Sequence, residues 1–243
     1  MIASLGMYDR AETAASNDAL WSAVRAELGY GPETLDRETD LMDIWKSPDL
    51  VLAQTCGMPY RTLLKDSVQL VGTPDYGLGG VPAGYYYSVF VVRAQDSAAL
   101  CDYQDRTIAH NDPGSQSGWA APTNHASSQG FQFKKPFFSG SHLASATAVA
   151  NGKADIASID AVSWRLIESY EACASKLKII EVTQATPGLP YITALGQNAG
   201  AIFTAVEHAI DGLPKAHRAI LGITSLSKIA PSAYLAVQTP PKP

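Results

Sequence analysis

The sequence predicts an α/β protein with two lobes that are joined by two extended crossings of the chain. Segments of strand and helix character alternate along its length, as they do in α/β units. Two segments, 85–93 and 181–193, are extended and suit passages from one lobe to the other. We therefore expect one lobe from residues 1–86 and 190–243, and the other from residues 87–189.

Length and composition restrict the class of protein. The chain has 243 residues, of which 46% are hydrophobic and 17% charged, so it can bury a sizeable core. No apolar run approaches the length of a membrane span. The net charge is −5 and no basic cluster exceeds Lys134-Lys135, which argues against nucleic acid as a partner. We expect disorder only in the Pro-rich tail, residues 239–243.

Cysteine and histidine spacing predicts no metal site, and no motif calls for a cofactor. The three cysteines are Cys56, Cys101 and Cys173. They form no CxxC pair, and their odd number argues against a disulfide framework. One disulfide between two of them stays open as an alternative. Four histidines show no spacing that suits a metal: His110, His125, His208 and His217. The opening residues, MIASLGMYD, have strand character and no pattern of an export signal. Two alternatives follow: a cytoplasmic protein, or an exported one whose signal is missing from this sequence.

Local patterns predict the individual elements. In the first lobe we expect strands at 2–7, 49–54 and 68–71, a helix capped by Ser16-Asn17-Asp18 that ends near Gly29, a short helix at 61–64, and helices at 199–211 and from Pro214 to near Gly222. Residues 31–48 suit a short strand and a helix, and 72–84 a loop. In the second lobe we expect strands at 85–93, 107–110, 154–159 and 178–183, and helices at 98–103 and 119–126.

The stretch from Ser139 to Trp164 combines the strongest signals. A polar cluster, Ser-Gly-Ser-His, opens a helix, and Gly152 suits the left-handed residue that closes it. A strand follows, and Asp160 caps a second helix. Helix N-termini present free N–H groups and partial positive charge, so they suit an anion. The alternative is that Ser141 and Asp160 are only caps.

A second unit of the same kind lies at residues 111–118, NDPGSQSG. A strand ends there in a Gly/Ser-rich turn and a helix begins at once. Ser115 and Ser117 can donate hydroxyls, and an anion can approach the backbone closely beside Gly114 and Gly118. The turn lacks the Gly-Lys-Ser/Thr ending of a P-loop, and a capped turn without a ligand is the alternative. Polar residues at several strand ends favour a site, because ligands of α/β sheets bind beyond the carboxyl ends of strands.

These motifs, NDPGSQSG and SGSHLASATAVANGKADIASIDAVSW, together with the crossing YYYSVFVVR, resemble the phosphate/phosphonate-binding family of ABC-transporter solute-binding proteins. The resemblance spans most of the chain. It implies a two-lobed periplasmic-binding-protein fold of type II, with a cleft between the lobes that closes on the ligand and with no catalytic residues. It also implies a phosphorus oxyanion as ligand (phosphate, phosphite or a phosphonate), an ABC-transporter permease as partner, and a periplasmic location.

The resemblance implies ligand contacts as well. The Ser-x-Ser turn, the histidine at the next helix start, and tyrosines of the other lobe and hinge correspond to Ser115, Gln116, Ser117, Gly118, His142, Tyr60 and Tyr86. Four further candidates lie at strand ends or helix starts: Tyr8, Thr55, Ser141 and Asp160. The Asp160 carboxylate suits an amino group on a phosphonate or a protonated phosphate oxygen, or it only caps a helix.

Two other functions stay open on the residues alone. An enzyme on the same fold would use Cys56, His142 and Asp160 as nucleophile, base and orienting group. Against it, a lone cysteine is more often a small buried hydrophobe. The missing export signal suggests the second alternative, a cytoplasmic ligand sensor.

Overall fold

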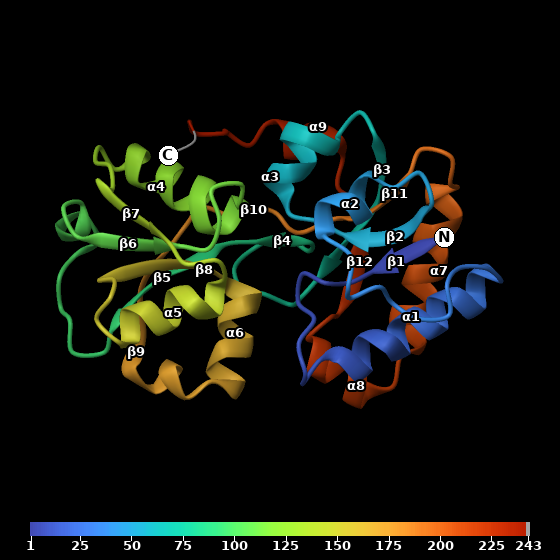
Figure 1. The fold of residues 1–243 in the computed structure, drawn as a ribbon, viewed down its shortest axis with the longest axis horizontal. Coiled ribbons are helices and arrows are strands. Elements are labelled where there is room, and N and C mark those ends of the chain that lie inside the picture. Colours follow the sequence, from blue (N-terminus) through green and yellow to red (C-terminus); the bar gives the residue numbers. More distant parts are fainter. Residues whose placement is uncertain (242–243) are drawn as a thin grey trace. The chain divides into compact units, whose positions relative to one another are not determined.

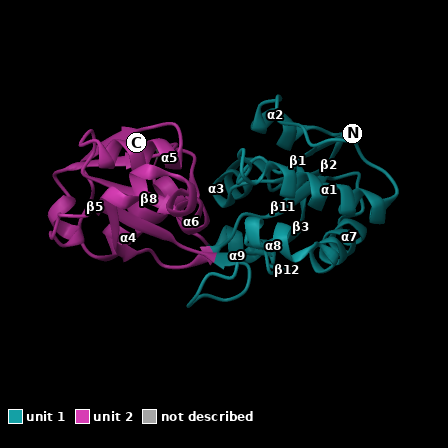
Figure 2. Ribbon diagram, turned by 90° about the horizontal axis from the view of Figure 1, so that it is seen from below, with its two compact units in different colours: residues 1–85, 187–236 teal, residues 86–186, 237–243 magenta. Residues whose placement is uncertain are grey.

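The structure, a computed structural model, describes residues 1–241 and divides the chain into two compact units (Figure 2). Unit 1 comprises residues 1–85 and 187–236. Unit 2 comprises residues 86–186 and the segment that begins at Val237. Each unit is an α/β body built on its own five-stranded sheet (Figure 1).

The sheet of unit 1 is mixed, and two of its strands, β11 and β12, run against their neighbours. Its order is β1 (Ile2–Ser4), β2 (Leu50–Gln54), β11 (Tyr191–Ala194), β3 (Val68–Asp75) and β12 (Ser225–Ser227). β1 and β2 are parallel, and β11 pairs antiparallel with both β2 and β3. Strands β1, β2 and β3 therefore end at the same edge of the sheet.

The helices of unit 1 bury two core clusters against this sheet. They are α1 (Ala14–Leu28), α2 (Leu41–Lys46), α3 (Gly57–Pro59), the π-helical turn η1 (Tyr60–Leu64), α7 (Ala199–Gly212), α8 (Lys215–Leu221) and α9 (Pro231–Leu235). Trp21 of α1 and Val206 of α7 belong to the larger cluster. Trp45, Tyr60 and Tyr234 belong to the second. Burial of such large side chains is the main source of stability.

The sheet of unit 2 also has five strands and is mixed. Its order is β7 (Lys135–Phe138), β6 (Thr107–His110), β8 (Ile156–Asp160), β5 (Ser88–Arg93) and β9 (Leu177–Val182). β7, β6 and β8 are parallel, and β5 is antiparallel to β8 and β9. The helical elements are η2 (Leu100–Tyr103), the π-helical turn η3 (Gln116–Ala120), α4 (Ala121–Ser128), α5 (His142–Ala150), α6 (Ala161–Tyr170) and η4 (Ala172–Lys176).

The chain leaves one unit for the other near two short strands. These strands, β4 (Tyr85–Tyr86) and β10 (Thr186–Pro187), form a two-stranded sheet. The C-terminal segment belongs to unit 2, where Trp119 Nε1 donates to the Pro241 carbonyl at 3.1 Å. The sequence prediction had placed 190–243 in one lobe and had set its boundaries at 86/87 and 189/190.

The structure confirms several expected elements and corrects others. α5 is capped by Ser141 and followed by Gly152 in the left-handed region (φ 74°), and α6 begins after Asp160, all as predicted. α1 begins at Ala14, not at the Ser16-Asn17-Asp18 cap. The side chains of Ser16 and Asn17 instead bond to His217 Nδ1 and Asp9 Oδ1, which removes them from capping.

Other differences concern strands and the chain ends. The predicted strand 85–93 is divided at Tyr87 into β4, which pairs with β10, and β5, which pairs with β8 and β9. The prediction missed β7, β12 and α9. β7 is an edge strand of its sheet and contains Pro136. Proline has no N–H to donate to a neighbouring strand, so it is tolerated at a sheet edge. Of the tail expected to be disordered, 242–243 lie outside the described residues, and 239–241 carry neither helix nor strand.

Candidate functional site

The carboxyl edge of the unit 2 sheet gathers the polar turns that the sequence singled out. Because β6, β7 and β8 are parallel, they end at the same edge. η3 follows β6, α5 follows β7, and α6 follows β8 directly. Three helical starts, with their N–H groups and partial positive charge, therefore lie at one edge of a single sheet.

The turn from Ser115 to Gly118 presents hydroxyl and N–H donors. Ser115 caps η3, and its Oγ accepts a hydrogen bond from Gly118 N at 3.0 Å. Ser117 Oγ lies 3.4 Å from Ser115 Oγ. The N–H groups of Gln116 and Ser117 are the first two of the turn. All four residues are buried, so any oxyanion bound here would be largely removed from water.

Gly118 is a glycine because of a close approach, not because of its φ angle. A Cβ at this position would overlap Asn111 Oδ1. Asn111 directly follows β6, so the absence of a side chain at residue 118 lets η3 pack onto the end of that strand.

Side chains from three strands fix the carbonyl groups of the turn to the sheet. Ser88 Oγ of β5 and Ser158 Oγ of β8 both donate to the Ser117 carbonyl, at 3.0 and 2.8 Å. His110 Nδ1 of β6 hydrogen-bonds to the Gly118 carbonyl. The sequence analysis missed these three residues as parts of the site. For Ser88 and Ser158 the available signal was a serine within a buried strand, in the segments SVFVVR and IASID.

Ser117 and His142 connect two of the turns. Ser117 Oγ and His142 Nε2 are 2.9 Å apart, while His142 Nδ1 is buried without a hydrogen-bond partner. Burial lowers the pKa of His142 to about 4, so the imidazole is neutral at pH 7. The position of His142 at the start of α5 acts in the same direction, since the helix dipole disfavours a cation there.

The two serines before His142 have structural bonds. Ser141 Oγ caps α5 by accepting from Ala144 N at 3.0 Å. Ser139 Oγ lies within hydrogen-bonding distance of the His110 carbonyl and of Ser145 Oγ, at 3.2 and 2.7 Å. The capping role expected for Ser141 is confirmed, and a ligand contact by it stays a prediction.

Asp160 caps α6 from the end of β8. Its Oδ1 accepts from Val162 N at 2.7 Å and from Ser163 N at 2.9 Å, and the residue is 2% exposed. Asp160 is the register partner of Ser88 in the antiparallel β8–β5 pair. It also shares a sheet face with Ser158, because side chains two residues apart point the same way. A buried carboxylate thus lies on the face that holds the Ser117 carbonyl.

The donors at this edge are uncharged. They are serine hydroxyls, backbone N–H groups at helical starts, and imidazoles that are neutral at pH 7. Hydrogen bonds from such donors to an ionised acceptor contribute about 1.5–3 kcal/mol each, more than neutral pairs do. The arrangement can therefore bind a small oxyanion without a lysine or arginine.

The remaining candidates near strand ends belong to unit 1. Tyr8 lies in the loop after β1, and its ring contacts Tyr76 edge to face, with centroids 5.1 Å apart. Thr55 follows β2, is 0% exposed, and its Oγ1 has no hydrogen-bond partner. Both residues lie beyond the carboxyl ends of parallel strands, as Ser115 does in unit 2.

Tyr60 and Tyr86 are buried tyrosines. Tyr60, 3% exposed, opens η1 and packs edge to face on Tyr234 at 5.3 Å. Burial raises its pKa. Tyr86 is also 3% exposed, and it lies in β4 at the start of unit 2. Within its unit, Tyr60 is first of all a core side chain.

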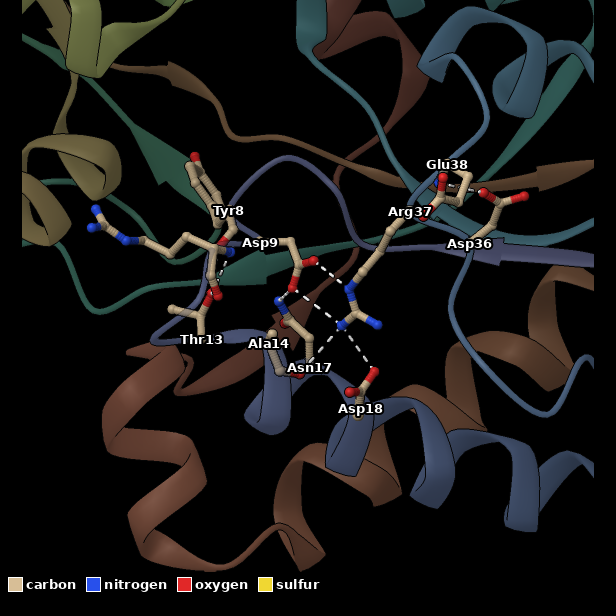
Figure 3. A network of polar contacts seen from close by, with 10 residues as sticks. Tyr8, Asp9, Thr13, Ala14, Asn17, Asp18, Asp36, Arg37 and Glu38 are labelled. Atoms are coloured by element: carbon tan, nitrogen blue, oxygen red, sulfur yellow. Dashed lines mark hydrogen bonds and ion pairs between the residues drawn. The ribbon is translucent and has the colours of Figure 1, made fainter.

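A polar network fixes the loop that carries Tyr8 (Figure 3). Asp9 lies between Asn17 and Arg37: Asn17 Nδ2 donates to Oδ1 at 2.8 Å and Arg37 Nε to Oδ2 at 2.6 Å. Arg37 also pairs with Asp18 at 2.9 Å, and Thr13 Oγ1 donates to the Tyr8 carbonyl at 2.8 Å. These bonds join the loop to the first turns of α1 and to the segment at residue 37.

The residues of the enzyme alternative are divided between the units. Cys56 is a buried cysteine of unit 1 outside any disulfide, whereas His142 and Asp160 belong to unit 2. Within residues 1–241, no group of three or more His, Cys, Asp or Glu side chains is placed to hold a metal. The same part of the chain contains no helix long and apolar enough to cross a bilayer.

Comparison with known families matches residues 7–234 to a model described as the phosphonate periplasmic substrate-binding protein of ABC transporters. The chain belongs to this phosphonate-binding family. Members of the family are periplasmic proteins that bind substrate for an ABC transporter, which is a role in binding and not in catalysis. No functionally curated protein matches the chain.

Solved structures share the fold of this phosphonate-binding family member at low sequence identity. PhnD1 of Prochlorococcus marinus, in complex with methylphosphonate, has a TM-score of 0.73 at 16% identity, over 96% of this chain and 93% of that one. A binding component of an ABC phosphonate transporter from Pseudomonas aeruginosa has a TM-score of 0.67 at 16% identity, covering 93% and 80%. A Xanthomonas citri protein bound to ATP has a TM-score of 0.66 at 15% identity, covering 96% and 91%. The predicted two-lobed, type II binding-protein fold is thus confirmed.

Proposed function

We propose that this protein binds phosphate, phosphite or a phosphonate and delivers it to the permease of an ABC transporter in the periplasm. The observation that carries the proposal is the pairing of Ser117 with His142 at an edge where helical starts converge. An edge of this kind suits an anion, because its N–H groups and partial positive charges face the position that a ligand would take.

The neutral imidazole gives the pair a chemical role. With its proton on Nε2, His142 donates to Ser117 Oγ, and the Ser117 hydroxyl is then left to donate to an oxyanion. Ser115, Gln116 and Gly118 shape the turn around that hydroxyl. Ser141 and Asp160 contribute at the starts of α5 and α6, where Asp160 would favour a ligand with a proton or an amino group.

Residues outside this edge complete the proposed set. Tyr8, Thr55 and Tyr60 contribute from unit 1, and Tyr86 from the crossing. Thr55 is supported by its buried hydroxyl, which lacks a partner and would gain one from a ligand. About four or five bonds to an oxyanion suffice for micromolar binding, roughly 8 kcal/mol, after the entropy lost on association.

A thermal-shift screen tests the function. The protein is heated with phosphate, phosphite, methylphosphonate, 2-aminoethylphosphonate or sulfate. A ligand that binds only the folded state adds about 2.7 kcal/mol at a hundredfold excess over Kd. We expect a clear rise in Tm with at least one phosphorus oxyanion and none with sulfate. The absence of a shift with every phosphorus compound would remove the assignment.

A further inference from the structure

His110 has contacts that the proposed ligand set does not use. It is the last residue of β6 and is 1% exposed, and its Nδ1 hydrogen-bonds to the Gly118 carbonyl. A carbonyl oxygen can only accept, so Nδ1 carries the proton. Nε2 is then an acceptor, and it is buried without a partner. Burial lowers the pKa of the ring to about 4, so it is neutral at pH 7.

The Gly118 carbonyl lies in the π-helical turn η3, where a carbonyl accepts from the N–H five residues later. In that register Pro122, which has no N–H, falls opposite the carbonyl of Ser117, and the hydroxyls of Ser88 and Ser158 donate to that carbonyl instead. His110 donates to the next carbonyl of the same turn, that of Gly118. A buried carbonyl without a donor is costly, so bonds from the sheet side stabilise this turn.

The main chain at the end of β6 bonds to the second turn. The His110 carbonyl accepts from Ser139 N at 2.8 Å, and the Asn111 carbonyl accepts from Gly140 N at 3.0 Å. The imidazole also packs against two aromatic rings, with centroids 5.0 Å from that of Trp119 and 5.7 Å from that of Phe138. His110 therefore touches both the turn that carries Ser117 and the turn that leads to His142.

We propose that His110 is a positioning residue, which holds the turn of Ser117 against the turn of His142 through its Nδ1 bond to the Gly118 carbonyl. The inference rests on the proposed function, because the two turns matter only if they bind ligand. His110 itself does not touch the ligand. Its ring fixes the geometry from the sheet side, as a supporting shell does for a binding site.

Two substitutions separate positioning from bulk stability. In His110→Asn an amide nitrogen takes the place of ring Nδ1, whereas in His110→Gln it lies one atom farther along the side chain. Calorimetric titration with methylphosphonate should give an affinity for His110→Asn within about threefold of wild type, and for His110→Gln about tenfold weaker or more. His208→Asn, an exposed histidine of unit 1, is the control and should be unchanged.

Four results overturn the inference. Wild-type affinity in His110→Gln would show that His110 is merely structural. An equal loss of affinity in both variants, in parallel with a fall in their Tm, would show the same. Either result would leave the proposed function intact. Nitrogen-15 NMR of the wild-type ring at pH 7 should report the Nδ1–H tautomer, and the Nε2–H tautomer would contradict the bond to Gly118. If wild type binds no phosphorus oxyanion at all, the proposed function and this inference both fail.

Discussion

Ser117 Oγ and His142 Nε2 lie 2.9 Å apart although 25 positions separate the two residues in the chain. β6 precedes the first and β7 the second, and these strands are parallel neighbours in the sheet. The pairing is therefore a consequence of sheet topology, and its predicted role can be tested one side chain at a time.

His142→Ala should weaken binding of a phosphorus oxyanion by about tenfold, because the hydroxyl of Ser117 loses the group that orients it. His142→Gln keeps an amide at the position of Nε2 and should retain most of the affinity. Calorimetric titration measures both, with His208→Ala as an exposed control. Unchanged affinity in His142→Ala would exclude His142 from the site.

Gly118→Ala should destabilise the protein by about 1–3 kcal/mol, because the added methyl group overlaps Asn111 Oδ1. Chemical denaturation of Gly118→Ala, Asn111→Ala and the double variant measures the coupling between the two positions. We expect the double variant to be more stable than the sum of the single effects. Strict additivity would mean that the Asn111 side chain does not set the need for glycine.

The free energy of unfolding should fall as the pH is lowered from about 6.5 to 4. Burial lowers the pKa of His110 from 6.5 to about 4 in the folded state. In this window the unfolded state binds a proton that the folded state does not, so stability rises with pH and is lost on acidification. A shift of this size corresponds to about 3 kcal/mol.

Denaturation curves at several pH values test that dependence. The variant His110→Asn has no group that titrates at this position and should lose less stability between pH 6.5 and 4 than wild type does. His142, with a pKa of about 4, contributes in the same direction and remains in both proteins. Equal losses in the two proteins would contradict the buried, neutral His110.

Arg37→Gln should loosen the loop that carries Tyr8. Arg37 bonds to Asp9 and pairs with Asp18, and it is partly shielded from solvent, so its loss should cost about 1 kcal/mol and less at high salt. Hydrogen exchange should speed up at residues 8–13. Lys65→Gln removes an exposed pair with Asp66 and is the control. Unchanged exchange in the loop would show that the network in Figure 3 does not hold it.

Much of the framework could be predicted, because its signals are local. Ser141, Gly152 and Asp160 mark helix boundaries through capping and a left-handed turn, which depend on few neighbours. The two turns of unit 2 were identifiable for the same reason, since each joins a strand to a helix within a few residues.

The rest of the site depends on contacts between distant segments. Ser88 and Ser158 act through one carbonyl of η3, and nothing near either in the sequence indicates that bond. Ser16 and Asn17 have the composition of a cap but bond to groups outside the helix start, so local preference misplaced the beginning of α1.

The central claim is that the Ser117 hydroxyl binds a phosphorus oxyanion, and calorimetric titration of Ser117→Ala tests it most directly. The ligand is whichever oxyanion gives the largest thermal shift with wild type. Ser169→Ala, which removes an exposed serine hydroxyl of α6, is the matched control. We predict a loss of affinity of about tenfold or more in Ser117→Ala and none in the control. Equal affinity in wild type and both variants would contradict the account.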